Sequence, residues 1–242
     1  MSETAATGPH RRAVVIMPAF REAENIGHTL EELASVRPDL DVVVVDDGSP
    51  DDTAAVARSA GARVLRHPFN LGIGGALRTG FRYAMEAGYE VAIQFDADGQ
   101  HDPTQIALLE NALDAGADMA VGSRFAPESQ RYRISPVRLG AMAVLRLVVR
   151  HVSGRRFTDT SSGFRAFRRP VIEFFARNYP YEYMESVEAL VLAVAAGFEV
   201  HEVPIAMRSR RGGEPSNRSL RLPYHYARLL LTIAVSAARR PT

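Results

Sequence analysis

The chain of 242 residues contains no cysteine and no lysine. Without cysteine it has no disulfide bond, no thiolate ligand for zinc and no cysteine nucleophile. Without lysine, a Walker A phosphate-binding lysine, a Schiff-base lysine and the usual anchor for pyridoxal phosphate are excluded. All 29 basic residues are therefore arginines, whose planar guanidinium groups bind phosphate in a bidentate manner.

The chain also lacks a large net charge and a long apolar run. Its formal charge of +1 provides no overall field for nucleic acid, so we expect no nucleic-acid partner. The apolar stretch LLLTIAVSAA near the C-terminus is about half of the roughly 20 residues that a membrane-spanning helix needs. Residues 1–12 are small and polar, without the apolar core of a signal peptide, and we expect a disordered tail there. A cytoplasmic location follows as the expectation.

Short apolar runs alternate with amphipathic stretches through the first half of the chain. The runs cover residues 13–17, 42–45, 62–66, 91–95 and 119–121, and helix-like patterns such as AENIGHTLEELASV and ALRTGFRYAMEAG separate them. Runs that are apolar at successive positions are typical of strands covered on both faces. The pattern predicts an α/β fold with a mostly parallel sheet flanked by helices, and the second half is expected to complete the same sheet.

Three of these predicted strands end in polar clusters. PAFREAEN follows the first run, DDGSPDDT the second and DADGQHD the fourth. In open α/β sheets ligands bind beyond the carboxyl ends of the strands, so the three clusters are expected to converge on one site.

The acidic turn DADGQHD has the composition of a site for a hard divalent cation. Asp96 and Asp98 lie one residue apart, so that their side chains project to the same side of an extended chain, and Gln100 adds a neutral oxygen. One or two carboxylates commonly hold Mg²⁺ or Mn²⁺, while water and substrate phosphates complete the coordination. By itself a pair of acidic residues at a strand end is more often a solvated turn. The histidines at 101, 151 and 201 lack metal-binding spacing and are expected at the surface or behind the site.

The cluster DDGSPDDT divides into two pairs of carboxylates. Ser49 is predicted to cap a helix over TAAVARSA, with Pro50 at its first position and Asp52 three residues after the cap, as in a capping box. Asp46 and Asp47 precede this cap at the end of the strand, where a carboxylate can accept a hydrogen bond from a nucleobase or a ribose hydroxyl. The glycines of NLGIGGALRTG, beginning with Gly72, allow close approach of backbone to a ligand but lack dinucleotide-binding spacing.

Seven motifs together carry a resemblance to a known family. VVIMPAFREAENI, VVVVDDGSPDDT, NLGIGGALRTGF, FDADGQHDP, VGSRF, TDTSSGFRAF and EVPIAMRSRRGG occur in this order from about residue 13 to residue 216. The chain resembles glycosyltransferase family 2, in particular its polyprenyl-phosphate branch, which includes enzymes similar to dolichyl-phosphate-mannose synthase. The resemblance implies a GT-A fold and transfer of a sugar from a nucleotide diphosphate sugar.

The resemblance also implies roles for individual residues. Around the nucleoside it places Pro18, Phe20, Glu22 and Asp47, with Asp46 less certain. The diphosphate and the metal fall to Asp96, Asp98 and Gln100, with Asp98 central to catalysis. Arg124 and Arg138 are implied to bind the lipid phosphate. Arg210 and Arg211 are implied to belong to a loop that closes over the donor. Several relatives have a lysine in the loop where this chain has Ile73, which leaves the identity of the donor open.

Three functions remain open at this point. A lipid phosphate is already an anion at neutral pH and needs to be positioned rather than deprotonated. A saccharide hydroxyl would need a general base, for which Asp159 and Glu185 are the candidates. A catalytically silent subunit that only binds nucleotide sugar is the third reading, which the intact DADGQ motif disfavours.

The expected organisation is a single GT-A domain over residues 13–217 and a basic amphipathic helix over residues 218–242. This last segment mixes leucines and aromatic residues with five arginines. Such a helix can lie in a membrane interface, although an ordinary helix packed on the sheet is an equal alternative. A lipid acceptor would place the protein at the inner face of the plasma membrane, with a small integral-membrane protein as a further partner.

Overall fold

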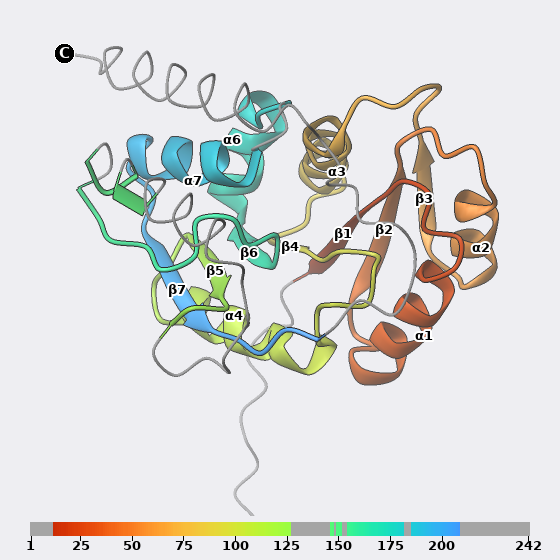
Figure 1. The fold of residues 1–242 in the computed structure, drawn as a ribbon, viewed down its shortest axis with the longest axis horizontal. Coiled ribbons are helices and arrows are strands. Elements are labelled where there is room, and N and C mark those ends of the chain that lie inside the picture. Colours follow the sequence, from red (N-terminus) through yellow and green to blue (C-terminus); the bar gives the residue numbers. More distant parts are fainter. Residues whose placement is uncertain (1–11, 127–145, 148, 152–153, 182–184, 209–242) are drawn as a thin grey trace, which may run out of the picture.

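A computed structural model describes residues 12–126, 146–147, 149–151, 154–181 and 185–208. Its strands and helices alternate through the first half of the chain, as Figure 1 shows. The strands are β1 (Ala13–Ala19), β2 (Asp41–Asp46), β3 (Arg63–Arg66), β4 (Val91–Gln94), β5 (Met119–Ser123), β6 (Arg165–Arg168) and β7 (Val200–Pro204). The helices are α1 (Ile26–Val36), α2 (Thr53–Ser59), α3 (Ile73–Glu86), α4 (Ile106–Asp114), α6 (Arg169–Asn178) and α7 (Glu185–Ala195), with the short 3-10 helix η1 (Pro103–Gln105) before α4.

All seven strands belong to one sheet, in the order β3-β2-β1-β4-β6-β5-β7. Strand β6 is antiparallel to both of its neighbours, β4 and β5, while the other pairs are parallel. The predicted mostly parallel sheet is therefore confirmed, and the second half of the chain completes it. The antiparallel direction of β6 was not part of the prediction.

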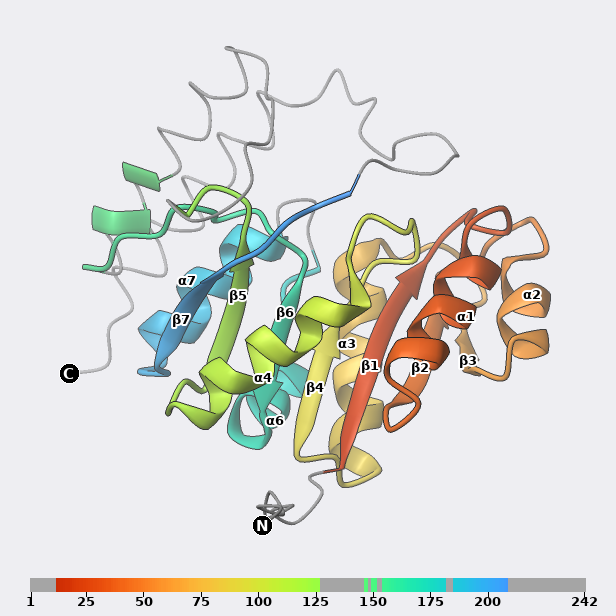
Figure 2. The same ribbon diagram turned by 90° about the horizontal axis from the view of Figure 1, so that it is seen from below.

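Helices cover both faces of the sheet (Figure 2). Helices α3, α6 and α7 lie on one face over a core that includes Ile16, Phe81 and Phe167. Helices α1 and α4 lie on the other face over Val15, Ile93 and Leu109. This two-sided burial explains why the strand runs are apolar at successive positions rather than at alternate ones. Among the described residues, no helix is both long and apolar enough to cross a bilayer.

The predicted capping box before α2 is wrong. The helix begins at Thr53, its N-cap is Asp52, and no side chain caps it. The Ser49 hydroxyl instead accepts a hydrogen bond from the Arg21 backbone N–H at 3.0 Å, which ties the end of β2 to the turn after β1. The Ser49 hydroxyl, which the local sequence predicts as a helix cap, therefore joins two neighbouring loops instead.

The predicted tail and C-terminal helix lie mostly outside the described residues. The description begins at Arg12, one residue inside the predicted tail, and the Arg12 carbonyl accepts hydrogen bonds from the backbone N–H groups of Glu90 and Val91. Residues 1–11 and 209–242 are not described. The predictions for these segments stay predictions.

Candidate active site

The carboxyl ends of β1, β2 and β4 lie side by side at one edge of the sheet. These strands are adjacent and parallel, with Pro18 opposite Val45 and Ile16 opposite Gln94. Because β6 runs in the opposite direction, its beginning lies at this same edge, between the ends of β4 and β5. The edge therefore brings together the predicted clusters and adds the segment that precedes β6.

The acidic turn after β4 is ordered by hydrogen bonds within the turn. The Asp98 carboxylate accepts a hydrogen bond from the Gln100 backbone N–H at 3.1 Å, and Gly99 has a positive φ of 74°. Asp98 is buried, while the side chain of Asp96 is 31% exposed. The turn therefore presents one partly exposed and one buried carboxylate to the edge of the sheet.

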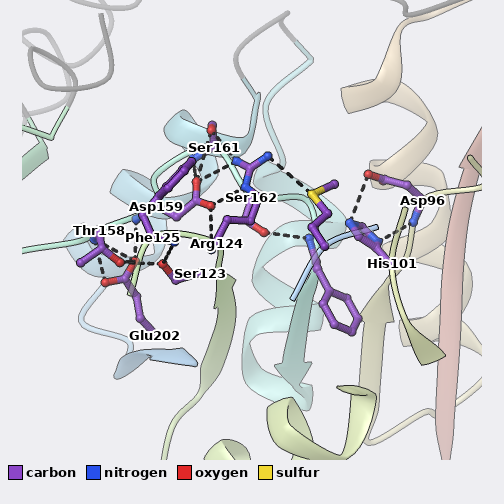
Figure 3. Close-up of polar contacts among 12 residues, drawn as sticks. Asp96, His101, Ser123, Arg124, Phe125, Thr158, Asp159, Ser161, Ser162 and Glu202 are labelled. Carbon is purple, nitrogen blue, oxygen red and sulfur yellow. Dashed lines mark hydrogen bonds and ion pairs between the residues drawn. The ribbon is translucent and has the colours of Figure 1, made fainter. Parts of the chain in front are cut away.

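His101 lies directly behind this turn (Figure 3). Its Nδ1 accepts a hydrogen bond from the Asp96 backbone N–H at 3.1 Å, so its proton is on Nε2, which lies 3.5 Å from the Asp96 carboxylate. The imidazole stacks on Phe164 with a centroid distance of 4.8 Å. Burial lowers the pKa of His101 to about 4, partly offset by Asp98, so the ring is neutral at pH 7. His101 therefore supports Asp96 as a neutral donor, which places it behind the site, as one of the two expectations had it.

The segment after β7 crosses the sheet edge and binds the acidic turn. The Arg208 backbone N–H donates to the Gln100 carbonyl at 2.9 Å, and the Gln100 side-chain amide donates to the Arg208 carbonyl at 3.4 Å. The Arg208 guanidinium also pairs with Glu32 and Asp102. Gln100 therefore joins the two segments through its backbone and its side-chain nitrogen.

The two aspartates at the end of β2 are both buried and both engaged. Asp46 accepts from the Ser49 N–H at 3.0 Å and pairs with Arg66 at 3.0 Å, so it holds the turn together. Asp46 is completely buried, and its contact with a ligand stays a prediction. Asp47 lies 2.7 Å from the His67 ring nitrogen and accepts from the Gly72 N–H at 2.8 Å. Contact between Asp47 and a base stays a prediction.

The other residues that the resemblance assigns to the nucleoside lie along the same edge. Phe20 is 37% exposed, beneath the Arg21 guanidinium at 5.3 Å. Glu22 is buried and accepts a hydrogen bond from the Asn25 side chain at 2.8 Å. Pro18 lies in β1, and Gly72 precedes α3 with a φ of 87°, a conformation that favours glycine. The structure thus brings these residues to one edge, and their contact with a nucleoside stays a prediction.

Arg124 follows β5 and forms a buried bidentate ion pair with Asp159 (Figure 3). Its Nε and one terminal nitrogen lie 2.6 Å and 2.9 Å from the two Asp159 oxygens. Glu202 of β7 holds the segment of Asp159 by accepting hydrogen bonds from the backbone N–H groups of Thr158 and Asp159. Burial by itself raises the pKa of Asp159, but the hydrogen bonds and charge of Arg124 outweigh this and hold the pKa below its usual value.

This pairing changes the interpretation of Asp159. A general base needs an oxygen available to the proton it removes and a pKa near the working pH. Both Asp159 oxygens already accept hydrogen bonds, and its pKa is lowered. The role of Asp159 as a base stays a prediction that this pairing disfavours, and in the structure Asp159 is the partner that orients Arg124.

Glu185, the second candidate base, begins α7 and has the opposite environment. It is buried, and burial raises its pKa, although a hydrogen bond from Ser186 and the charge of Arg165 reduce the effect. Arg138, Arg210 and Arg211, the other arginines assigned to phosphate, lie outside the described residues.

Comparison with known proteins agrees with this geometry. Residues 14–175, more than half of the chain, match the model of "Glycosyl transferase family 2". The chain belongs to this glycosyltransferase family. It is 32% identical over 223 residues to the polyprenol monophosphomannose synthase of Mycolicibacterium smegmatis, covering 87% of this chain and 83% of the relative. It is also 32% identical to the undecaprenyl-phosphate mannosyltransferase of Micrococcus luteus, covering 84% and 86% of the two chains.

Solved structures support the family 2 fold. The glucosyl-3-phosphoglycerate synthase of Mycobacterium tuberculosis, in complex with Mn²⁺, uridine diphosphate and phosphoglyceric acid, aligns with a TM-score of 0.72. The alignment covers 96% of this chain and 80% of that structure, at 21% identity. The predicted GT-A fold is confirmed, and the protein is a nucleotide-sugar-dependent glycosyltransferase of family 2.

Sequence reasoning missed a second set of polar residues, which lies beside the acidic turn. Gln94, Arg165 and Tyr179 are completely or almost completely buried. The core under α3, α6 and α7 contains Tyr179 and also Ala92 and Phe167, which lie two positions from Gln94 and Arg165 and so point to the same face. Gln94 interrupts the apolar run VAIQF, which was the one local signal available. Arg165 belongs to the SSGFRAF motif, but no pattern in the sequence indicates that an arginine there is buried.

Proposed function

We propose that this protein is an inverting glycosyltransferase that transfers a sugar from a nucleotide diphosphate sugar to a polyprenyl phosphate, with Mg²⁺ or Mn²⁺ as its cofactor. The observation that carries the proposal is the position of a fixed arginine next to the acidic turn. His101, which supports Asp96, stacks on Phe164, and the Phe164 carbonyl accepts from Gly122, two residues before Arg124. Carboxylates for a cation and a guanidinium for a phosphate thus share one edge of the sheet.

The residues of the acidic turn fit a hard divalent cation. Among the described residues, no group of three or more His, Asp or Glu side chains could hold a metal alone. Mg²⁺ and Mn²⁺ do not need such a group, because two carboxylates together with water and diphosphate oxygens suffice. Asp96, Asp98 and the Gln100 side-chain oxygen are the residues that would hold the ion. When bound, the ion stabilises the negative charge that develops on the leaving diphosphate.

The protein's own residues position the two reactants. The acceptor phosphate oxygen forms a bond to the anomeric carbon as the bond to the diphosphate breaks on the opposite face, which inverts the configuration. A phosphate monoester is ionised at pH 7, so no side chain has to remove a proton. Asp159 holds the Arg124 guanidinium in one orientation, and such preorganisation favours binding of an anionic group.

The names of the relatives support this acceptor. Both the polyprenol monophosphomannose synthase and the undecaprenyl-phosphate mannosyltransferase are named for polyprenyl lipids. A peripheral position at the inner membrane face, where such a lipid is accessible, is part of the proposal. One observation favours a second candidate, transfer to a saccharide hydroxyl. Burial raises the pKa of Glu185 above its usual value, which suits a general base.

The deciding experiment compares two acceptors that differ only in the phosphate. The purified full chain is incubated with Mn²⁺, radiolabelled UDP-glucose or GDP-mannose, and either undecaprenyl phosphate or undecaprenol. We expect label in the phosphate lipid alone. Asp98→Asn serves as the control for background activity and should lower turnover on the order of a hundredfold.

Two results would contradict the proposal in different ways. Label transferred to undecaprenol or to an added oligosaccharide, with none on the lipid phosphate, would favour the hydroxyl acceptor. Donor binding without turnover on any acceptor would favour the silent nucleotide-sugar-binding subunit.

A further inference from the structure

A buried polar cluster lies beside the acidic turn, made up of Gln94, Arg165 and Tyr179. Both side-chain atoms of the Gln94 amide, the Nε and one terminal nitrogen of Arg165, and the Tyr179 hydroxyl are buried without a hydrogen-bond partner among the described residues. The known contact of the Arg165 guanidinium is a hydrogen bond of 2.7 Å to the Ser186 carbonyl at the start of α7.

The three side chains belong to one neighbourhood. Gln94 and Arg165 are directly paired across β4 and β6, which lie next to each other in Figure 2. Tyr179 directly follows α6 and belongs to the core layer that also contains Ala92 and Phe167, the residues two positions from Gln94 and Arg165 in their strands. The cluster therefore lies on this face of the sheet, at the end of β4 and the start of β6, and Arg165 reaches the start of α7 through Ser186.

Gly163 connects this cluster to the acidic turn. A Cβ atom at Gly163 would lie 3.2 Å and 3.3 Å from the two Asp96 carboxylate oxygens and 3.3 Å from the Gln94 side-chain nitrogen. The Asp96 carboxylate and the Gln94 amide thus face the same small space, which a side chain at position 163 would fill. Since the Asp96 side chain is 31% exposed, the cluster begins next to a group that solvent and substrate can contact.

The chemistry of the unpartnered atoms indicates the kind of ligand. Buried polar groups in native proteins nearly always have partners, so several without one in a single place point to a ligand or to bound water. Arg165 can only donate, whereas Gln94 and Tyr179 can both donate and accept. A sugar hydroxyl both donates and accepts and therefore matches this set. A phosphate accepts only and would lie near two carboxylates, and an apolar group would leave every atom unpartnered.

We propose that the buried polar cluster binds hydroxyl groups of the transferred sugar and so determines which sugar the enzyme accepts. This inference rests on the proposed function, because it requires a nucleotide diphosphate sugar whose diphosphate lies at Asp96. The sugar is attached to that diphosphate, and the proposal requires its hydroxyls to lie on the side of Asp96 where Gln94 and Arg165 lie.

The test separates binding of the sugar from binding of the nucleotide. Gln94→Met and Tyr179→Phe remove the polar atoms and keep the shape of each side chain. Tyr181→Phe is the matched control, because Tyr181 is an exposed tyrosine two residues from Tyr179. Calorimetry with Mn²⁺ measures the Kd of each protein for UDP and UDP-glucose, and for GDP and GDP-mannose.

We expect the variants Gln94→Met and Tyr179→Phe to bind the nucleotide diphosphate as the wild type does and the nucleotide sugar about tenfold more weakly. Their melting temperatures should not fall, since removing an unpartnered buried polar group is neutral or stabilising. Donors that lack one hydroxyl identify the contact. The deoxy donor that loses affinity for the wild type should lose little more for the variant that lacks the partner of that hydroxyl.

Equal loss of affinity for nucleotide and nucleotide sugar, or no loss for either, would overturn the inference and leave bound water as the occupant of the cluster. A wild-type protein that binds neither nucleotide nor nucleotide sugar would overturn the proposed function itself. The two failures are therefore distinguishable in one set of titrations.

Discussion

Arg124 and Asp159 form an ion pair in which each side chain neutralises the charge of the other. The pair is almost completely buried, and Asp159 accepts from the Arg124 side chain and from its backbone N–H. A buried ion pair of this kind contributes little as a whole, but breaking it leaves a buried charge without compensation. The pair therefore fixes the orientation of Arg124, and the stability of the fold depends on both partners.

We expect Asp159→Asn to lower the free energy of unfolding by about 3 kcal/mol at pH 7, because the Arg124 charge stays buried without its partner. Urea denaturation of both proteins measures this difference. The pKa of Asp159 is below its usual value in the folded protein. Its stabilisation is therefore present above the unfolded pKa of about 3.9 and is lost only as the pH falls through the lower folded pKa. The difference should thus persist from pH 7 to pH 5.

The control for this prediction is an exposed ion pair. Glu199 pairs with Arg155 at the surface, and we expect Glu199→Gln to change stability little, since solvent screens such pairs. A loss of stability in Asp159→Asn as small as that in Glu199→Gln would mean that Arg124 finds another partner or moves into solvent. Asp159 would then not fix the orientation of Arg124.

Single residues were predictable from the sequence where their roles depend on local position. Asp96 and Asp98 follow a strand run directly, which placed them at the sheet edge. The sequence could not show that Asp46 is buried against Arg66 or that Ser49 contacts Arg21, because both contacts join segments that only the fold brings together. Gln94 and Arg165 were missed for the same reason, since the pairing of β4 with β6 creates their neighbourhood.

At the scale of elements, the contact of α3 with β1 depends on a glycine. A Cβ atom at Gly80 would lie 2.2 Å from Cγ2 of Ile16, a completely buried residue of β1. The helix can lie this close to the sheet only because position 80 has no side chain. Asp47 accepts hydrogen bonds from the backbone N–H groups of Leu71 and Gly72, which directly precede α3, so this packing distance also positions the loop beside the end of β2.

We expect Gly80→Ala to destabilise the protein by about 1–3 kcal/mol, because the added methyl group overlaps Ile16 and forces α3 or β1 to shift. Replacing glycine by alanine in a helix also contributes a gain of roughly 1 kcal/mol in helix propensity, which opposes this loss. Thermal unfolding of the two proteins gives the net effect.

Gly27→Ala in α1 is the matched control, because the nearest atom to its Cβ would be Cγ1 of Val56 at 3.2 Å, which a small side-chain movement relieves. We expect it to be neutral or slightly stabilising. Equal behaviour of the two variants would mean that α3 lies farther from β1 than the structure places it.

The predicted elements succeeded where periodicity is strong. The apolar runs at 13–17, 42–45 and 91–95 correspond to β1, β2 and β4, and the amphipathic stretches correspond to α1 and α3. Periodicity does not encode the order or direction of strands. For this reason the position of β6 between β4 and β5 followed only from the three-dimensional structure.

At the scale of the whole molecule, β6 connects the two halves of the chain. It lies between β4, which the acidic turn follows, and β5, which ends one residue before Arg124. The proposed donor and acceptor sides of the site therefore belong to one sheet. The apolar layers described on its two faces include residues from Ala13 to Ile205.

Truncation after Asn217 tests what those residues do. The segment that follows is leucine-rich and aromatic and contains Arg218, Arg221, Arg228, Arg239 and Arg240. We expect the truncated protein to keep its melting temperature and to transfer sugar to a short-chain, water-soluble polyprenyl phosphate, because the residues assigned to the chemistry precede position 218. It should no longer sediment with anionic vesicles, whereas the full chain should do so at low salt and detach at high salt. Each arginine near an anionic surface contributes about 1 kcal/mol, so five are sufficient only if they face the lipid together.

Loss of the melting transition on truncation would instead show that the segment packs on the sheet, and a full chain that never sediments with vesicles would favour a separate membrane partner. Either result would remove the membrane contact from the proposed function while leaving the assignment of Asp96, Asp98 and Arg124 to be judged by turnover alone.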